Sequence, residues 1–175
     1  MKTKVLSVIF GLLLLGTVGE LSHAATFTVY PSTFSGSPGY SNPTSAYDGS
    51  FTTASSVSLT QLQKGGSGRL EDWLGFPARP GGATGLTLNI NSSAATGPGG
   101  QVRISYSLDG GNTFTSVYCL CYGGSRAQAT DTISLSDSQD LTQVRVRAQA
   151  LAQSVGTGES TASSSVYEIW ISGSD

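Results

Sequence analysis

The chain has 175 residues, the length of one ordinary domain. Charged residues make up 11% of it, 23 residues are glycine, and the formal net charge is −2 with a pI near 5.2. The apolar fraction of 38%, taken with the glycines, lies in the range of globular chains and argues against wholesale disorder. The acidic balance, without a basic cluster, argues against a nucleic-acid partner.

The first 24 residues have the pattern of a secretory signal peptide. Lys2 and Lys4 give a positive start, residues 5–15 are apolar, and Ser22 and Ala24 are the small residues before a cleavage site. We therefore expect a mature chain of residues 25–175, a single domain exported to the periplasm or the extracellular space, with no membrane span. An uncleaved N-terminal anchor helix is the alternative.

Removal of that segment also removes His23, the only histidine. The mature chain then has seven basic residues (9 minus Lys2 and Lys4) and ten acidic ones (11 minus Glu20), a net charge of −3. Without histidine there is no Ser–His–Asp or Cys–His mechanism and no histidine-ligated zinc or copper. A two-carboxylate glycosidase is the hydrolase class left open, and no Asp/Glu pair in the sequence indicates it.

In chain order, the mature sequence shows short stretches in which polar and apolar residues alternate. Strands are expected at residues 26–30, 86–90, 102–106, 114–120, 132–135, 144–150 and 166–171. A period of two is typical of antiparallel strands with one buried face. Residues 58–64 fit one helical turn, and no longer helical pattern occurs.

Glycine, proline and Asp/Asn clusters separate these stretches, and residues 107–114 are typical of a tight hairpin. Seven to nine short strands joined by such turns predict an all-β fold, an antiparallel β-sandwich or jelly roll. Residues 61–82 and 151–165 are expected to be long loops, where a rigid sandwich usually binds its ligands.

Three segments carry motifs in a recognisable order: residues 46–53 (AYDGSFTT), 104–114 (ISYSLDGGNTF) and 166–171 (VYEIWI). They resemble, respectively, the A-x-D-G-D-x-x-T loop, the V-x-Y-S-x-D-G-x-x-W hairpin and the closing strand of discoidin-like, galactose-binding-like jelly-roll domains. The order and spacing fit most of residues 26–173. The resemblance implies a jelly-roll sandwich with a binding role.

The resemblance also implies a structural calcium ion between the early loop and the last strand. The matching positions are Asp48, Thr53 and Glu168, with Ser50 where many relatives have a second aspartate. Calcium prefers six to eight oxygen ligands, so the serine removes one charged ligand. Alternation along the last strand places Glu168 on the outward face with Val166. The competing interpretation is that Asp48 caps an Asx-turn and Glu168 is a solvated carboxylate.

Sugar-binding residues are expected mainly in the 61–82 segment. An exposed aromatic ring offers an apolar face to a pyranose, while polar side chains bind its hydroxyls. The candidate ligand-binding residues are Trp73, Asp72, Glu71, Arg79, Tyr40 and Tyr122. Residues 73–76 also fit a buried strand that enters the sandwich, so a core position for Trp73 is the competing interpretation.

Cys119 and Cys121 form a C-x-C pair that an exported chain can oxidise to a disulfide. Residues i and i+2 of a regular strand have Cα atoms about 6.5–7 Å apart, so a bridge requires a bulge or twist. A free pair oxidised between chains is the alternative. Arg145 and Arg147 alternate along one strand and are interpreted as a solvated or edge-protecting face.

Together these patterns favour a secreted, non-catalytic module that binds carbohydrate or another extracellular surface component through loops at one end of a β-sandwich. The alternative is a structural subunit of an extracellular or cell-surface assembly, which would use its strand edges to associate.

Overall fold

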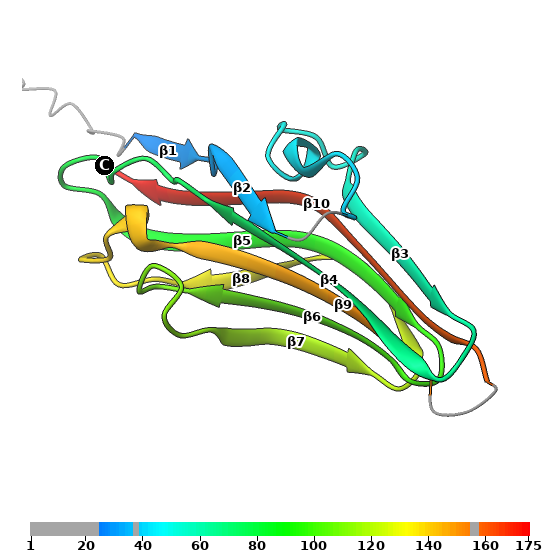
Figure 1. Ribbon diagram of the computed structural model, residues 1–175. Helices are drawn as coiled ribbons and strands as arrows, with labels where there is room; N and C mark the ends of the chain where they lie inside the picture. Colours follow the sequence, from blue (N-terminus) through cyan, green and yellow to red (C-terminus); the bar gives the residue numbers. More distant parts are fainter. Residues whose placement is uncertain (1–24, 37–38, 155–157) are drawn as a thin grey trace, which may run out of the picture.

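The computed structural model describes residues 25–36, 39–154 and 158–175, which form two antiparallel β-sheets packed face to face (Figure 1). Sheet A contains β1 (Thr26–Val29), β3 (Ser55–Gln61), β5 (Thr84–Thr96), β8 (Gly124–Ser134) and β10 (Ser160–Ser174). Sheet B contains β2 (Thr33–Gly36), β4 (Gly65–Leu74), β6 (Gly100–Ser107), β7 (Thr115–Cys121) and β9 (Arg145–Ser154). The predicted all-β antiparallel sandwich is confirmed. The predicted signal peptide, residues 1–24, lies outside the described residues.

Strand order in both sheets mixes segments that are distant in the sequence. Sheet A runs β1–β10–β5–β8, with β3 also paired to β10, and sheet B runs β2–β4–β9–β6–β7. Two short 3-10 helices, η1 (Pro43–Ala46) and η2 (Leu141–Gln143), lie in the connections. The chain passes from sheet A to sheet B directly after β1, so β1 and β2 occupy edges of different sheets. Within the described residues, no helix has the length and apolar character needed to cross a membrane.

The core lies between the sheets, and the two-residue alternation decides which side chains enter it. Leu86, Leu88 and Ile90 of β5 are buried against the other sheet, whereas the intervening Thr87 and Asn89 lie on the outer face. The facing β9 contributes mainly small residues to the core. Burial of apolar area from both sheets is the dominant stabilising term in such a fold.

Strand β4 occupies much of the segment that was expected to be a long loop. The loop prediction for residues 61–82 is wrong, because β4 pairs with β9 from Gly65↔Ser154 to Trp73↔Val146. Its first residues are Gly-Gly-Ser-Gly, which give no apolar alternation to detect. The helical turn expected at residues 58–64 is also wrong, since β3 continues to Gln61, and β9 and β10 extend into residues 151–165.

The hairpin expected at residues 107–114 forms, and its aspartate has a structural role. Asp109 accepts hydrogen bonds from the hydroxyl of Thr113 at 2.6 Å, from the backbone N–H of Thr113 at 2.9 Å and from the hydroxyl of Ser107 at 2.7 Å. These bonds hold the pKa of the Asp109 carboxyl well below its usual range. Gly110 and Gly111 supply φ angles of 74° and 96° that the turn requires.

Cys119 and Cys121 are joined by a disulfide on β7, the edge strand of sheet B, with a Cα–Cα distance of 6.0 Å. That separation is shorter than in a regular strand, and the β6–β7 ladder has a register shift between Ile104 and Ser105. At the cysteines the register is regular, from Gln101↔Cys121 to Arg103↔Cys119, so of the bulge or twist that the bridge was expected to need, the bulge is absent at this position.

Candidate functional site

Trp73 is a core residue, so its predicted role in stacking on a sugar is wrong. Its side chain is fully buried, packs edge-on against Tyr40 with 6.2 Å between ring centroids, and donates a hydrogen bond from Nε1 to the carbonyl of Pro43 at 2.9 Å. The physical reason is alternation along β4, which directs Trp73 between the sheets and leaves Asp72 on the opposite face.

Asp72 is engaged on the outer face of sheet B. Its two carboxylate oxygens accept from Nε and a terminal nitrogen of Arg147, both at 2.7 Å, and the Arg147 guanidinium stacks 3.8 Å from the ring centroid of Phe114. Hydrogen bonding to Asp72 raises the pKa of Arg147 further. Asp72 is therefore occupied by an ion pair and is not a free acceptor for sugar hydroxyls.

Arg79 and Tyr122 lie apart from the other predicted ligand residues. Arg79 ties two loops together by donating to the carbonyls of Ala83, at 2.9 Å, and Asp137. Tyr122 follows the disulfide strand in a turn, with a positive φ of 62° and a side chain that is 83% exposed. The structure consequently gives no single cluster that contains all six predicted residues.

Two of the predicted residues, Tyr40 and Glu71, do meet, in a groove of about 430 Å³ at one side of the sandwich. Its other lining residues are Phe34, Ser35, Gly36, Gly39 and Pro43. Residues around Ser41 are held to β3 of sheet A by two backbone hydrogen bonds between Ser41 and Ser56, while β2 belongs to sheet B. The segment containing η1, cyan in Figure 1, lies between β2 and β3, so the groove is where the edges of the two sheets approach.

Glu71 is the chemically distinctive group of this groove. The residue is 4% exposed, and no described group donates a hydrogen bond to its buried Oε1. Burial, and secondarily the charge of Asp72, raise the pKa of Glu71 to about 7. A buried carboxylate oxygen without a partner is costly, so Glu71 has an acceptor available for a ligand donor.

Phe34 is the groove residue that sequence reasoning missed. It pairs with Trp73 across the β2–β4 ladder, but at the sheet edge, where 44% of the side chain stays exposed. The only signal in the sequence is an aromatic residue within a short Thr-Phe-Ser-Gly run. Gly36 is needed beside it, because a Cβ there would collide with the backbone of Leu70 and Glu71.

The loop predicted to bind calcium lies against Glu168. Asp48 Oδ1 accepts from the backbone N–H of Ser50 at 2.9 Å, which is the Asx-turn, and Oδ2 accepts from the hydroxyl of Thr53 at 2.7 Å. The hydroxyl of Ser50 is instead bonded to the hydroxyl of Thr52 at 2.9 Å. The side chains of Asp48 and Thr53 are thus bonded to each other, whereas the hydroxyl of Ser50 is bonded to another residue of the same loop.

Glu168 is buried, so the interpretation of it as a solvated carboxylate is wrong. The residue is 2% exposed, and neither carboxylate oxygen has a full hydrogen bond from a described group. Burial raises the pKa of Glu168 to about 7, the nearby charge of Asp48 adds to this, and the N–H groups of Ser50 and Gly49 oppose it. Val166 points into the core, contrary to expectation, because a β-bulge separates it from Glu168.

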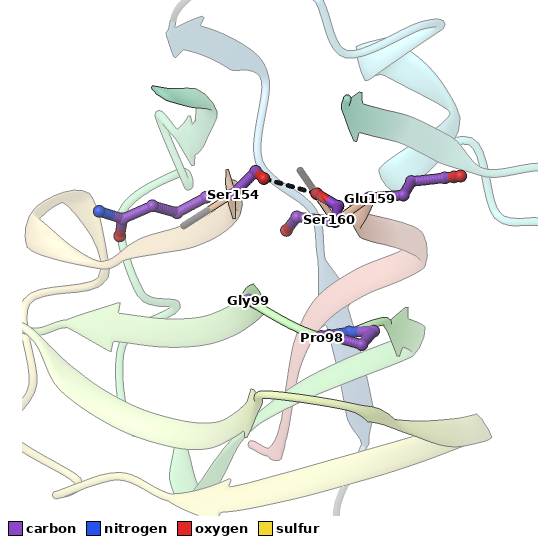
Figure 2. A pocket seen from close by; sticks show the side chains of 7 residues that line it. Pro98, Gly99, Ser154, Glu159 and Ser160 are labelled. Atoms are coloured by element: carbon purple, nitrogen blue, oxygen red, sulfur yellow. Dashed lines mark hydrogen bonds between the residues drawn. The ribbon is translucent and has the colours of Figure 1, made fainter. Parts of the chain in front are cut away.

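A smaller cavity of about 230 Å³ lies where β9 ends and β10 begins (Figure 2). Its described lining includes Pro98, Gly99, Glu159 and Ser160, and none of these residues is aromatic. The hydroxyl of Ser154 donates to the carbonyl of Gly158 at 2.5 Å across it. The described part of its lining has neither an ion pair nor an exposed aromatic ring that would indicate a ligand.

No protein-family model and no curated protein matches this sequence. Solved structures to which the chain is similar include TmCBM61 in complex with beta-1,4-galactotriose, at 11% identity and TM-score 0.38, covering 79% of this chain and 86% of that one. Another is the family 32 CBM from C. perfringens NanJ in complex with galactose, at 14% identity and TM-score 0.35, covering 85% and 99%. A third is chitosan-binding module 2 from Paenibacillus sp. IK-5 in complex with chitotriose, at 19% identity and TM-score 0.29, covering 83% and 93%. At these scores the likeness is one of general strand arrangement and identifies neither a ligand nor a site in this chain.

Proposed function

We propose that this chain is an exported, non-catalytic module that binds a glycan in the groove formed by Phe34, Tyr40 and Glu71. The observation that carries the proposal is the exposed ring of Phe34 in the same groove as the buried, unpartnered Oε1 of Glu71. Sugar recognition needs this combination, because a pyranose has an apolar face of C–H groups and a rim of hydroxyl donors.

Each groove residue has a distinct role in this proposal. Phe34 offers a ring face for stacking, and Glu71 accepts hydroxyl hydrogen bonds. Tyr40 lines the same groove, and its buried phenol oxygen lies near the hydroxyl of Ser164. A volume of about 430 Å³ falls in the range of small-ligand sites.

The carboxylate geometry supports binding without turnover. Glycoside hydrolysis requires two carboxyl groups flanking the scissile bond. Asp72, the neighbour of Glu71, faces the opposite side of sheet B and is paired with Arg147. Asp48 and Glu168 are close to each other, but the two oxygens of Asp48 already accept hydrogen bonds from Ser50 and Thr53 within the loop.

A glycan-array screen of the full chain, followed by isothermal titration with the best oligosaccharide, tests the proposal. Phe34→Ala and Glu71→Gln should each weaken binding about tenfold or more, the equivalent of about 1.4 kcal/mol. Tyr122→Ala, which removes an exposed ring far from the groove, is the matched control and should bind normally. Unchanged affinity in both groove variants would refute the site.

We also propose that Asp48, Thr53 and Glu168 hold a structural calcium ion. The two buried oxygens of Glu168 fit this ion, because the N–H groups of Ser50 and Gly49 near them form no well-aligned hydrogen bond and a cation would balance the buried negative charge. Asp48 and Thr53 retain lone pairs after their mutual hydrogen bond. Calcium would fasten the loop to β10. We propose in addition that the chain works in an oxidising compartment that contains calcium. The disulfide and the signal-peptide pattern support this.

A further inference from the structure

The outer face of sheet A has an unusual composition. The strand register places on it Thr28 of β1, Thr87, Asn89 and Asn91 of β5, Gln128, Thr130, Thr132 and Ser134 of β8, and Trp170 and Ser172 of β10. The only acidic or basic side chain among the described strand residues on this face is Glu168, which is buried. Arg126 and Asp131 of β8 lie at inner-face positions and pair with each other at 2.7 Å.

The polar side chains on this face are joined by hydrogen bonds across three strands. The hydroxyl of Thr132 donates to Asn89 Oδ1 at 2.9 Å, and Asn89 Nδ2 lies 3.3 Å from the hydroxyl of Ser172. Further along, Asn91 Nδ2 donates to the hydroxyl of Thr130 at 2.8 Å. Asn89 and Asn91 are each 7% exposed, so their amides hold the exposed side chains of Thr130 and Thr132 in place before a ligand arrives, which lowers the entropic cost of binding.

Aromatic rings lie beside the network. Trp170 is paired with Asn89 in the ladder and packs edge-on against Phe51, with 5.5 Å between centroids. Phe51 is 49% exposed, and its carbonyl accepts from Gln128 Nε2 at 3.0 Å, which fastens its loop to β8. Tyr30 is 38% exposed and directly follows Val29, the partner of Ile171, so the register brings it to the position opposite Trp170.

We propose that the outer face of sheet A, centred on Trp170, Phe51 and Thr132, is a second binding surface for a neutral, hydroxyl-rich polysaccharide chain. This inference rests on the proposed glycan-binding function and extends it from a groove to a face. The charge pattern determines the occupant. An anionic glycan would find no exposed cation among the described residues of this face, whereas a neutral one can stack on the rings and exchange hydrogen bonds with the exposed hydroxyls of Thr130, Thr132 and Ser134.

Affinity gel electrophoresis of the full chain in gels containing galactan, xyloglucan or mixed-linkage β-glucan tests this inference, with polygalacturonate as the anionic comparison. At least one neutral polymer should retard the wild type, and polygalacturonate should not. Trp170→Ala and Thr132→Ala should weaken the retardation, Trp170→Ala by about tenfold. Thr132 is exposed, so its variant keeps the test valid if Trp170→Ala proves unstable in a thermal scan.

The variants distinguish binding in the groove from binding on the outer face of sheet A. Retardation lost in Phe34→Ala but unchanged in Trp170→Ala and Thr132→Ala would overturn the face and leave the groove intact. Retardation reduced by the face variants but not by Phe34→Ala would support the face and count against the groove. No retardation of the wild type by any polymer would contradict both. A wild type that elutes as a dimer and a Trp170→Ala variant that elutes as a monomer, without retardation of either, would assign the face to self-association and overturn the inference.

Discussion

The outer faces of the two sheets share a core but differ in chemistry. Sheet B presents Arg103, Arg145 and the Arg147–Asp72 ion pair, together with the disulfide of β7. Sheet A presents threonines, asparagines and a tryptophan joined by neutral hydrogen bonds. Both faces come from the same two-residue alternation, so the alternation sets only which residues face water. The residue types at the wet positions set what each face can bind.

The side chains on the two outer faces are therefore held in place by different kinds of interaction. The ion pair of sheet B depends on charge, so dissolved salt screens it in proportion to its exposure. The neutral network of sheet A depends on the geometry of amides and hydroxyls, which salt affects little. The variants below test whether that distinction holds.

The largest effect is expected from Asp72→Ala on sheet B. The substitution leaves the partly buried guanidinium of Arg147 without its acceptors, and we expect a loss of about 2–3 kcal/mol in the free energy of unfolding. Urea denaturation measures it, with Arg147→Ala and the double variant completing a mutant cycle. The coupling energy should shrink when sodium chloride is raised from 0.05 to about 1 M. A loss below about 0.5 kcal/mol would show that the pair contributes little.

Calcium should produce the next largest change. If calcium binds Asp48, Thr53 and Glu168, calcium at a hundred times its dissociation constant stabilises the fold by about 2.7 kcal/mol, or about 5–10 °C in Tm. Differential scanning fluorimetry with added calcium and then with chelator measures it. Glu168→Gln should abolish the shift, and Asp109→Asn is the matched control at a carboxylate that binds only its own hairpin. An equal shift in Glu168→Gln would place the ion elsewhere.

A smaller loss is expected from Asn89→Ala on sheet A. It removes the acceptor of Thr132 and the donor to Ser172, and we expect the free energy of unfolding to fall by about 1–2 kcal/mol. Urea denaturation in low and high salt should give the same loss, in contrast to Asp72→Ala. If this loss in the free energy of unfolding depended strongly on salt, the proposed difference between the two faces would be contradicted.

The smallest effect concerns Glu71, whose pKa is raised from 4.5 to about 7. The folded state therefore holds this proton more tightly than the unfolded state, and its contribution to stability is present below pH 4.5 and declines as the pH rises through about 7. The charged groups around it are Asp72 and, on the same strand, Arg69, with the phenol of Tyr40 facing it. The Tm of the wild type minus that of Glu71→Gln should fall by about 2–4 °C between pH 5 and pH 8.

Binding in the groove should have the opposite pH dependence. The carboxylate accepts more hydrogen bonds when ionised, so affinity for a neutral oligosaccharide should rise from pH 6 to pH 8 in the wild type and stay constant in Glu71→Gln. Titration calorimetry at the two pH values measures it. A pH-dependent affinity that persists in the variant would assign the effect to another group.

The sequence predicted the architecture well, because alternation along β5, β6 and β9 is a local property. It also predicted the 107–114 hairpin, whose Asp109 and glycines determine a turn without help from the rest of the chain. It failed for β4, where Gly-Gly-Ser-Gly gives no pattern and these residues are held in a strand by their pairing with β9.

The candidate sites were harder to predict because they depend on register. Asn89, Thr132 and Trp170 become neighbours only once three strands are aligned, and nothing local to any of them gives that alignment. Phe34 and Glu71 likewise meet only through the pairing of β2 with β4. The motif resemblance did point to Asp48 and Glu168, which the structure brings together, but the bulge after Val166 had no visible signal.

Chemical-shift mapping on the ¹⁵N-labelled chain tests the account most directly. Titration with a neutral oligosaccharide that binds in the array screen should shift amide signals around Phe34 and Glu71 and on the outer face of sheet A near Trp170, and the glycan should be recovered uncleaved. Shifts concentrated on Arg103, Arg145 and Arg147 of sheet B, or cleavage of the oligosaccharide, would contradict it.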